Sequence, residues 1–479
     1  MDAHRFVCRH SLPRLLAALA LLLTTLVVPI AHQQVLAQDA TNIRFAFWGD
    51  TAEQAAYQSV VDAFEIAHPN IDVTVDYTPG QGDYYRKIAS DFAAGDAPDV
   101  YLTNYRQFGQ YAGAGGLAPI QSYLDTSTQL SESDYYGLSL DAFRFGGDNE
   151  LYCLPQNISS LVVYYNEDMF AAAGVPLPVD GWNWDTFVAA AQALTQDTDG
   201  DGTIDQYGVV VEPSMYRMVS FIWGADGEVV DDLDHPTTLT IDSPAAIDGL
   251  SKFISLGVDG YNVVPPEAEV AAESDQDRFM RGGAGMYIQS RRPVPTLREI
   301  EGFDWNVVSL PTLNQPATVL HSDAFCMAAS AENQDAVWTF IEFAGSAQGQ
   351  TLLAETGRTV PSMISVSESD VFLKGIPASA SSGTPGASPE AVEALPPANS
   401  QVYLDNIENM HRLPSISTWV EIEDAFNAEF DRSFYIEGFD VQAAAEAATA
   451  NSQDAFDRAS QCPGGKCLKP RIPFNRGGF

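Results

Sequence analysis

Acidic residues alternate with small residues in one short stretch of the chain. Oxygen-bearing side chains stand at every second position, with Gly202 at the sixth, as in the first part of a calcium-binding loop. The twelfth position is Gly208, so the glutamate that normally closes such a loop is missing. A turn built from Asp and Gly is the alternative. The predicted ligands of a structural calcium ion, the one cofactor that the sequence suggests, are Asp197, Asp199, Asp201, Thr203 and Asp205.

Familiar catalytic motifs are absent from the sequence. It contains no Gly-x-Ser-x-Gly elbow, no His-Glu-x-x-His helix and no phosphate-binding Walker loop. Its histidines are scattered without the spacing of metal ligands. Among the 64 acidic residues, no two carboxylates stand out as a catalytic pair for glycoside hydrolysis. The chain is therefore predicted not to be an enzyme, with a secreted polysaccharide hydrolase or lyase as the catalytic alternative.

Aromatic side chains offer a second kind of chemistry, because the flat apolar faces of sugars stack on rings. Trp184 and Trp338 lie in helical stripes and are expected in the core. Trp48 instead lies where a strand ends, directly before Gly49 and Asp50. Ligands of open α/β sheets bind at the carboxyl ends of strands, so Trp48 is a candidate for ligand contact.

The segments that must position these side chains alternate between strand and helix. Ile43, Phe45 and Phe47 alternate as in a strand, and a helical stripe of apolar residues follows them. The next predicted elements are a strand at 71–77, a helix at 84–94 and a short strand at 100–103. After Pro155 the pattern resumes, with a helix that Asn183 caps. This rhythm predicts mainly parallel sheets covered by helices, in two α/β lobes.

Composition and charge exclude several classes of protein. The 479 residues include 64 acidic and 24 basic side chains, which give a net charge of −40 and disfavour nucleic acids and anionic lipids as partners. Hydrophobic residues make up 46% of the chain, so global disorder is excluded. Arginines followed by the apolar run 15–30 predict a cleaved secretory signal. Cys462 and Cys467 are predicted to pair, whereas Cys153 and Cys326 either pair or are separate core residues.

Six segments, taken in order, resemble one known family. They are Phe45–Asp50, Ala97–Tyr101, Gly116–Pro119, Val162–Phe170, Phe279–Met286 and Trp338–Ile341. Their order and spacing resemble the extracellular solute-binding proteins of ATP-binding cassette importers for carbohydrates, the family of maltose-binding-protein-like receptors. The resemblance implies a two-lobed, type II periplasmic-binding-protein-like α/β fold that closes on a sugar. It further implies a monomer, exported to the periplasm or the outer cell face, that delivers the sugar to permease subunits.

The resemblance also implies how the chain is divided. Hinge crossings are expected near 153–157, 283–286 and 321–325. The expected parts are a signal peptide at 1–37, lobe 1 at 40–153 and 285–322, and lobe 2 at 154–284 and 323–376. A flexible insertion at 377–400, C-terminal helices at 401–460 and a loose tail at 461–479 complete the chain.

Site residues follow from the segments that align with the family. The implied ligand-binding residues are Trp48, Asp50, Tyr105, Arg106, Ser159, Tyr216, Trp223, Arg292, Asp323 and Trp419. Ser159 stands where maltose-binding relatives have Glu, which argues against a maltodextrin ligand. Arg292 could pair with neighbouring hydroxyls or with an acidic sugar. Receptors for a sugar phosphate, a polyamine or a ferric ion, and a surface adhesion protein, are the alternatives that remain open.

Overall fold

The computed structural model describes residues 40–147, 149–375 and 394–461. The described residues from Thr41 onward belong to one compact unit, which the description below concerns. The predicted signal peptide, residues 377–393 of the predicted insertion, and Cys462 and Cys467 lie outside the described residues. Within the described ranges, no helix is both long enough and apolar enough to cross a membrane.

The first sheet is built from the alternating apolar strands at the start of the described chain. Its order is β2-β1-β3-β12-β6, in which β1 pairs parallel with β2 and β3, and β12 runs antiparallel to β3 and β6. Phe45 of β1 packs against the rings of Tyr57, Phe325 and Phe340, so three separate segments share one core. The strands are β1 (Thr41–Trp48), β2 (Ile71–Thr78), β3 (Val100–Asn104), β6 (Cys153–Pro155) and β12 (Asp323–Met327).

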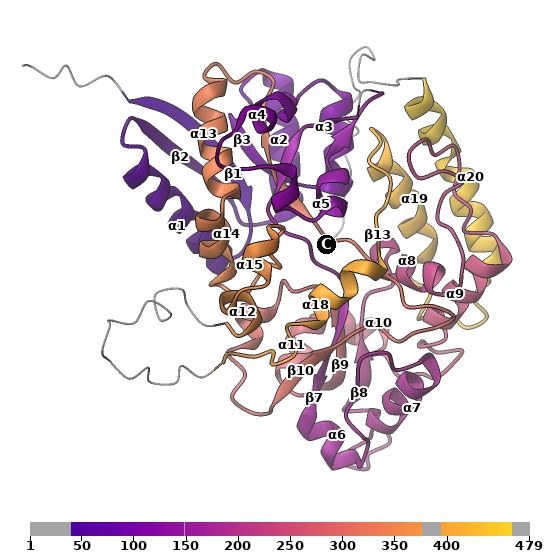
Figure 1. Ribbon diagram of the computed structural model, residues 1–479. Coiled ribbons are helices and arrows are strands. Elements are labelled where there is room, and N and C mark those ends of the chain that lie inside the picture. Colours follow the sequence, from indigo (N-terminus) through magenta and orange to yellow (C-terminus); the bar gives the residue numbers. More distant parts are fainter. Residues whose placement is uncertain (1–39, 148, 376–393, 462–479) are drawn as a thin grey trace, which may run out of the picture. The chain divides into compact units, whose positions relative to one another are not determined.

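Helices surround this sheet, as Figure 1 shows. The predicted stripe of Tyr57, Val61 and Phe64 is buried on α1, and Gly95, with a φ of 74°, ends α2 as predicted. Trp338 is buried on α13, as expected. The helices are α1 (Thr51–Ala67), α2 (Gln81–Ala94), α3 (Tyr105–Gly113), α13 (Gln334–Gly345) and α14 (Ala347–Ala354).

The second sheet has the order β10-β7-β9-β8, and only its β8–β9 pair is parallel. Asn183 accepts a hydrogen bond from the Thr186 N–H and caps α7, which confirms the predicted helix start. The strands are β7 (Val162–Asn166), β8 (Tyr207–Val210), β9 (Ala284–Gln289) and β10 (Trp305–Val308). The helices are α6 (Glu167–Ala173), α7 (Trp184–Leu194), α8 (Met215–Gly224), α9 (Pro244–Ile254) and α11 (Asp275–Met280). We call the parts built on the first and second sheets lobe 1 and lobe 2.

The predicted boundaries of the lobes are wrong after residue 284. Strand β9 pairs with β7 and β8, and β10 pairs with β7, so residues 285–308 belong to lobe 2 rather than lobe 1. Strand β12 joins the first sheet, and α13 packs against β1 and α1, so residues 323–354 belong to lobe 1 rather than lobe 2. The expected crossing at 283–286 does not occur, because the chain passes from α11 into β9 within lobe 2. The crossings near 153–157 and 321–325 are confirmed, since β6 and β12 lie in the first sheet and β7 and β10 in the second.

Shorter elements and the C-terminal helices complete the described chain. Helix α19 (Trp419–Phe430) packs against α3 of lobe 1 and α8 of lobe 2, and α20 (Val441–Ser460) packs against α9. The C-terminal helices therefore contact both lobes. The remaining elements are α4 (Gln121–Thr126), η1 (Glu132–Asp134), α5 (Gly137–Asp141), β4 (Arg144–Phe145), β5 (Glu150–Leu151), α10 (Glu267–Val270), α12 (Val294–Leu297), β11 (Thr318–Val319), α15 (Ile364–Ser367), α16 (Asp370–Leu373), α18 (Val402–Asp405), η2 (Asn406–Asn409) and β13 (Met410–His411).

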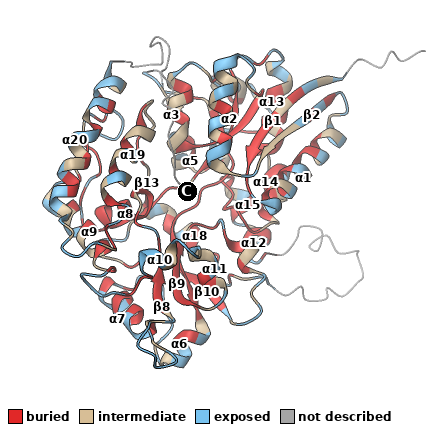
Figure 2. Ribbon diagram, turned by 180° about the vertical axis from the view of Figure 1, so that it is seen from behind, coloured by how far each residue is buried: buried red, intermediate tan, exposed pale blue. Residues whose placement is uncertain are grey.

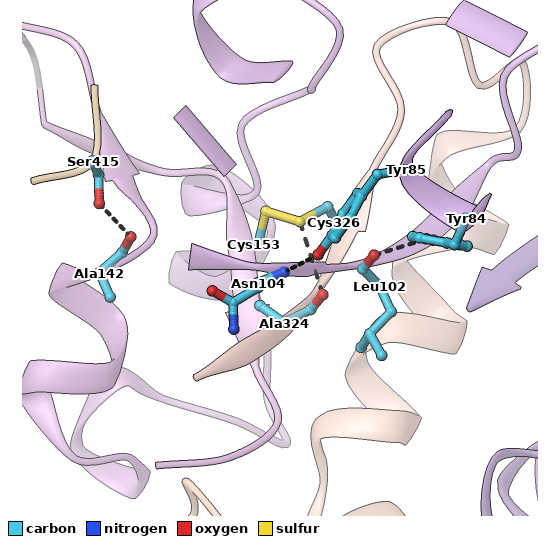
Figure 3. The surroundings of a disulfide bond; sticks show 9 residues. All are labelled: Tyr84, Tyr85, Leu102, Asn104, Ala142, Cys153, Ala324, Cys326 and Ser415. Atoms are coloured by element: carbon cyan, nitrogen blue, oxygen red, sulfur yellow. Dashed lines mark hydrogen bonds between the residues drawn. A yellow bond between two sulfur atoms is a disulfide. The ribbon is translucent and has the colours of Figure 1, made fainter. Parts of the chain in front are cut away.

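A disulfide joins Cys153 of β6 to Cys326 of β12, where the two residues are opposite each other in the antiparallel ladder. Figure 3 shows this bond beside β3 and Asn104. The sequence left the pairing of these two cysteines open, and the structure settles it. Figure 2 shows most strands of the two sheets buried, whereas the edge strand β2 is partly exposed, and many exposed residues lie along the surrounding helices. The disulfide thus lies inside lobe 1, on the strands that lead to and from the hinge.

Candidate ligand-binding site

The end of β1 places two carboxylates beside an arginine. Asp50 caps α1 by accepting a hydrogen bond from the Glu53 N–H at 2.9 Å. Arg358 pairs with Asp50 at 2.7 Å and with Glu53 at 2.6 Å. Gly49 has a φ of 150°, and a Cβ atom there would collide with the Glu53 carboxylate. Glycine at this position therefore allows the two carboxylates to share one guanidinium group.

The pKa values of these two carboxyl groups move in opposite directions. Burial raises the pKa of Asp50, but the charge of Arg358 and the hydrogen bonds from Glu53 and Arg358 outweigh it, so the pKa is lowered. Burial raises the pKa of Glu53 to about 7, although the positive charge of Arg358 opposes it. Asp50 is therefore ionised at neutral pH, whereas Glu53 exchanges a proton near neutrality.

The adjacent end of β3 meets the start of β12 at the same edge of the sheet. The ladder places Asp323 opposite Asn104, whose Nδ2 donates to the Asp323 carboxylate at 3.0 Å. The Asn157 side-chain oxygen accepts from the Asp323 backbone N–H at 2.6 Å, which ties the hinge to this position. Burial raises the pKa of Asp323 to about 6. A buried carboxylate is thus presented where the chain re-enters lobe 1.

Lobe 2 contributes the first turn of α8 to the same region. The guanidinium carbon of Arg106, from lobe 1, lies 4.7 Å from the centre of the Tyr216 ring, and that of Arg217 lies 4.9 Å from it. The His321 ring lies 5.6 Å from the same Tyr216 ring. Arg106 also pairs with Glu423 of α19. Tyr216 is therefore the point at which residues of both lobes and of the hinge meet.

Several polar atoms around Tyr216 are buried without a hydrogen-bond partner among the described residues. These atoms are Arg106 Nε, the Tyr216 hydroxyl, Arg217 Nε and Nη1, and His321 Nδ1. A buried polar atom without a partner is costly, and such atoms gather where a ligand will satisfy them. We call the following residues the polar cluster: Asp50, Glu53, Asn104, Arg106, Tyr216, Arg217, Arg292, His321, Asp323 and Arg358.

The hinge supplies Ser159, and the segment after β9 in lobe 2 supplies Arg292. The backbone groups of Ser159 and His321 bond to each other at 2.8 Å in both directions, and the Ser159 hydroxyl accepts from the Arg291 N–H at 3.3 Å. Arg292 is exposed, and its positive charge opposes the effect of burial on the pKa values of both Asp50 and Asp323. Arg292 therefore acts on the acidic side of the polar cluster, as an exposed residue of lobe 2.

The aromatic candidates lie in different surroundings. Trp48 is buried against the rings of Tyr84 and Tyr85, at 4.9 and 5.3 Å. Trp223 stacks on His411 at 4.8 Å, so one face of its ring is covered by the chain itself. Trp419 is fully buried in α19. The Tyr105 hydroxyl accepts from the Leu413 N–H at 3.4 Å. The structure therefore surrounds these four rings with protein and places Tyr216 in the polar cluster.

Five members of the polar cluster were not predicted from the sequence: Glu53, Asn104, Arg217, His321 and Arg358. Asn104 directly precedes the candidate Tyr105, and Arg217 directly follows the candidate Tyr216. His321 lies two residues before Asp323, so a wider window around each candidate would have included all three. Arg358 carries no local signal, because it reaches the start of α1 from a loop some 300 residues away.

The predicted calcium loop joins α7 to β8. Asp197, Asp199 and Asp205 bring one oxygen each within 4.8 Å of one another, and all three are exposed. The Asp197 carboxylate accepts from the N–H groups of Gly200 and Gly202, and Asp201 accepts from the Thr203 N–H. These bonds fit the alternative of an Asp/Gly turn. Calcium binding at this loop stays a prediction.

Comparisons with known proteins agree with this architecture. The sequence model of the bacterial extracellular solute-binding protein family matches residues 48–351 of the 479. A binding protein of Brucella abortus is 24% identical over 320 residues, which cover 64% of this chain and 72% of the relative. The galactooligosaccharide-binding protein of Bacillus subtilis is 21% identical over 368 residues, 74% of this chain and 82% of the relative.

Solved structures show the same fold. A substrate-binding protein of an ABC transporter from Listeria monocytogenes, in complex with cycloalternan, superposes with a TM-score of 0.72 at 23% identity. The match covers 88% of this chain and 99% of that protein. The two sheets, the hinge crossings between them and the match of the family model over more than half of the sequence establish that the chain belongs to the bacterial extracellular solute-binding protein family.

Proposed function

We propose that the protein is the receptor of an ABC importer and binds a sugar at the polar cluster. The observation that carries this proposal is the group of unpartnered polar atoms around Tyr216, contributed by both lobes and the hinge. Sugar hydroxyls donate and accept hydrogen bonds, and the cluster offers both carboxylates and guanidinium groups as partners. The relatives from Bacillus subtilis and Listeria monocytogenes, named for a galactooligosaccharide and solved with cycloalternan, support a sugar as the ligand.

The proposed role is binding without catalysis. Arg106 of lobe 1 meets Tyr216 of lobe 2, so a ligand held between these residues favours an arrangement in which the lobes are close. The permease then receives the sugar from this closed form. Export fits a family whose members are extracellular, and the apolar N-terminal run fits a signal peptide. We expect the mature protein to act as a monomer, free in the periplasm or held at the outer cell face.

A thermal-shift screen against a sugar panel tests the proposed ligand class. A ligand present at 100 times its Kd stabilises the folded state by about 2.7 kcal/mol, which raises the melting temperature measurably. Small-angle scattering with the best ligand should then show a smaller radius of gyration. The proposal fails if no sugar shifts the melting temperature while a polyamine or a ferric complex does. Release of shortened sugar during incubation would show an enzyme instead.

A further inference from the structure

The region around Tyr216 is rich in groups that can only donate hydrogen bonds. The Arg217 side chain is 7% exposed, and its Nη2 donates to the Gln289 side-chain oxygen at 2.9 Å. Its Nε and Nη1 have no hydrogen-bond partner in the part of the chain that the structure describes. Arg106 Nε is in the same situation. Guanidinium nitrogens carry no acceptor, so a ligand must offer acceptor oxygens to satisfy them.

Positive charge is also in excess on this side of the polar cluster. Arg106 is balanced by Glu423, with which it forms a largely buried pair. The nearest carboxylate of Arg217 is that of Glu212, 3.5 Å away and 59% exposed, where water screens the attraction. Asp275 also acts on Arg217, and although burial raises the pKa of that carboxyl to about 6, it is still mostly ionised at pH 7. Buried charges are normally paired, yet among the described residues Glu212 is the only carboxylate within ion-pair distance of Arg217.

The pKa of His321 reflects the same excess of positive charge. Burial, together with the positive charges of Arg106, Arg217, Arg292 and Arg358, lowers the pKa of its imidazole to about 3. The ring is therefore neutral at physiological pH and adds no charge of its own. Among the described residues its Nδ1 has no partner, so it is available to an adjacent ligand group.

We propose that the bound sugar carries a carboxylate, as a hexuronate does, and that Arg217 and Arg106 bind this group beside Tyr216. This inference rests on the proposed sugar-binding function and narrows it. A carboxylate supplies acceptor oxygens without protons, and its charge balances the guanidinium of Arg217. A hydroxyl in the same place would leave that positive charge uncompensated. The opposite side of the polar cluster, with Asp50, Glu53 and Asp323, suits the hydroxyl groups of the same sugar.

Matched pairs of sugars test the proposal. Calorimetric titration at pH 7 compares glucose with glucuronate, galactose with galacturonate, and the corresponding neutral and acidic disaccharides. We expect the acidic member of at least one pair to bind 10-fold or more tightly than the neutral member. A neutral sugar that binds as well as its acidic counterpart overturns the carboxylate proposal and leaves the sugar receptor intact. Tighter binding of glucose 6-phosphate than of glucuronate overturns it in favour of a phosphate. No binding by any sugar rejects the proposed function itself.

Variants of Arg217 locate the group that recognises the acid. Arg217→Met should weaken binding of the acidic sugar at least 10-fold while changing its neutral counterpart less than threefold, and Arg217→Lys should recover part of the loss. Arg432→Met, at an exposed residue paired with Glu267 far along the chain, controls for the change in net charge. Thermal melts verify that each variant is folded. Equal losses for the acidic and the neutral sugar in both Arg217 variants overturn the proposed contact.

Discussion

Glu53 is a carboxyl group whose charge the folded protein disfavours, and this has a measurable consequence. Burial raises its pKa from the ordinary 4.5 to about 7, although Arg358 lies 2.6 Å away. The folded protein therefore holds a proton on Glu53 between pH 4.5 and 7, where the unfolded chain has lost it. Stability from this group is complete below pH 4.5 and is lost as the pH rises through 7. The rise of the pKa from 4.5 to about 7 corresponds to about 3 kcal/mol of unfolding free energy, at about 1.36 kcal/mol for each pKa unit.

Replacing Glu53 with Gln removes this titration and keeps the shape of the side chain. We expect Glu53→Gln to be more stable than the wild type at pH 8, by up to about 3 kcal/mol, and to differ little at pH 4.5. The Asp50–Arg358 pair, at 2.7 Å, still anchors the arginine in the variant. The difference between variant and wild type reports Glu53 together with its coupling to Asp50 and Asp323, because more distant carboxyl groups titrate alike in both proteins.

Urea denaturation at half-unit steps from pH 4.5 to 8 measures this effect. The free energy of unfolding of the wild type should fall, relative to that of Glu53→Gln, as the pH rises towards 8. Glu446→Gln, at an exposed position of α20, controls for the loss of one formal charge. Two curves that stay parallel over this range would refute the reasoning, since Glu53 would then have the same pKa in the folded and unfolded states. A variant that is less stable at pH 8 would show that the ion pair with Arg358 outweighs burial.

Three further predictions concern the framework of the site. Replacing both Cys153 and Cys326 with Ala removes a link across 173 residues of sequence and should lower the free energy of unfolding by about 5 kcal/mol through loop entropy, as measured by urea denaturation. Replacing Cys462 and Cys467 with Ser serves as the control, and an unchanged urea midpoint in the Cys153/Cys326 variant contradicts the prediction. Trp223→Ala should cost about 3–5 kcal/mol of stability, because the ring is buried against His411, with sugar affinity kept within about threefold; a selective loss of affinity would instead make Trp223 a ligand contact. Arg106→Met should destabilise the folded protein by about 3–5 kcal/mol, because Glu423 loses its partner, and adding Glu423→Leu should recover most of that stability. Additive losses of stability in the double-mutant cycle would argue against a stabilising pair.

Local patterns predicted the elements of the fold well. Apolar residues at every second position marked β1, and helical spacing marked α1 and α7, because burial on one face is encoded within a few residues. The Asn183 cap and the Gly95 stop are likewise short-range signals. The expectation of mainly parallel sheets held for β1, β2 and β3, whereas every other pair of the two main sheets except β8–β9 is antiparallel. Pairing direction depends on topology, which local patterns do not record.

The assignment of later segments to lobes failed for the same reason. Strand β9 is an apolar run that suits either sheet, and nothing within its residues says that it pairs with β7 and β8. One crossing placed wrongly at 283–286 then exchanged the lobes of residues 285–308 and 323–354. The confirmed crossings carry a clearer signal, since Pro155 ends β6 in one sheet before Val162 begins β7 in the other.

Candidates at the ends of strands joined the polar cluster more often than candidates chosen as rings. Asp50 follows β1, Arg106 follows β3 and Asp323 begins β12, so the sheet topology brings all three to one edge. Trp223 and Trp419 were chosen for their aromatic character, and both are buried among residues of the core. A large aromatic ring can either pack in the core or contact a ligand, and the sequence alone does not show which of the two occurs.

The position of the disulfide bears on how a ligand moves the lobes. Cys326 lies three residues after Asp323 on β12, and its partner Cys153 lies on β6, the strand that leads out to lobe 2. The disulfide and the ladder together hold β12 in fixed register against β6 and β3. A ligand that bonds to Asp323 therefore pulls on the first sheet as a whole rather than on a single strand. The movement that closes the lobes must then arise in the short segments between the sheets, where Ser159 and His321 bond to each other.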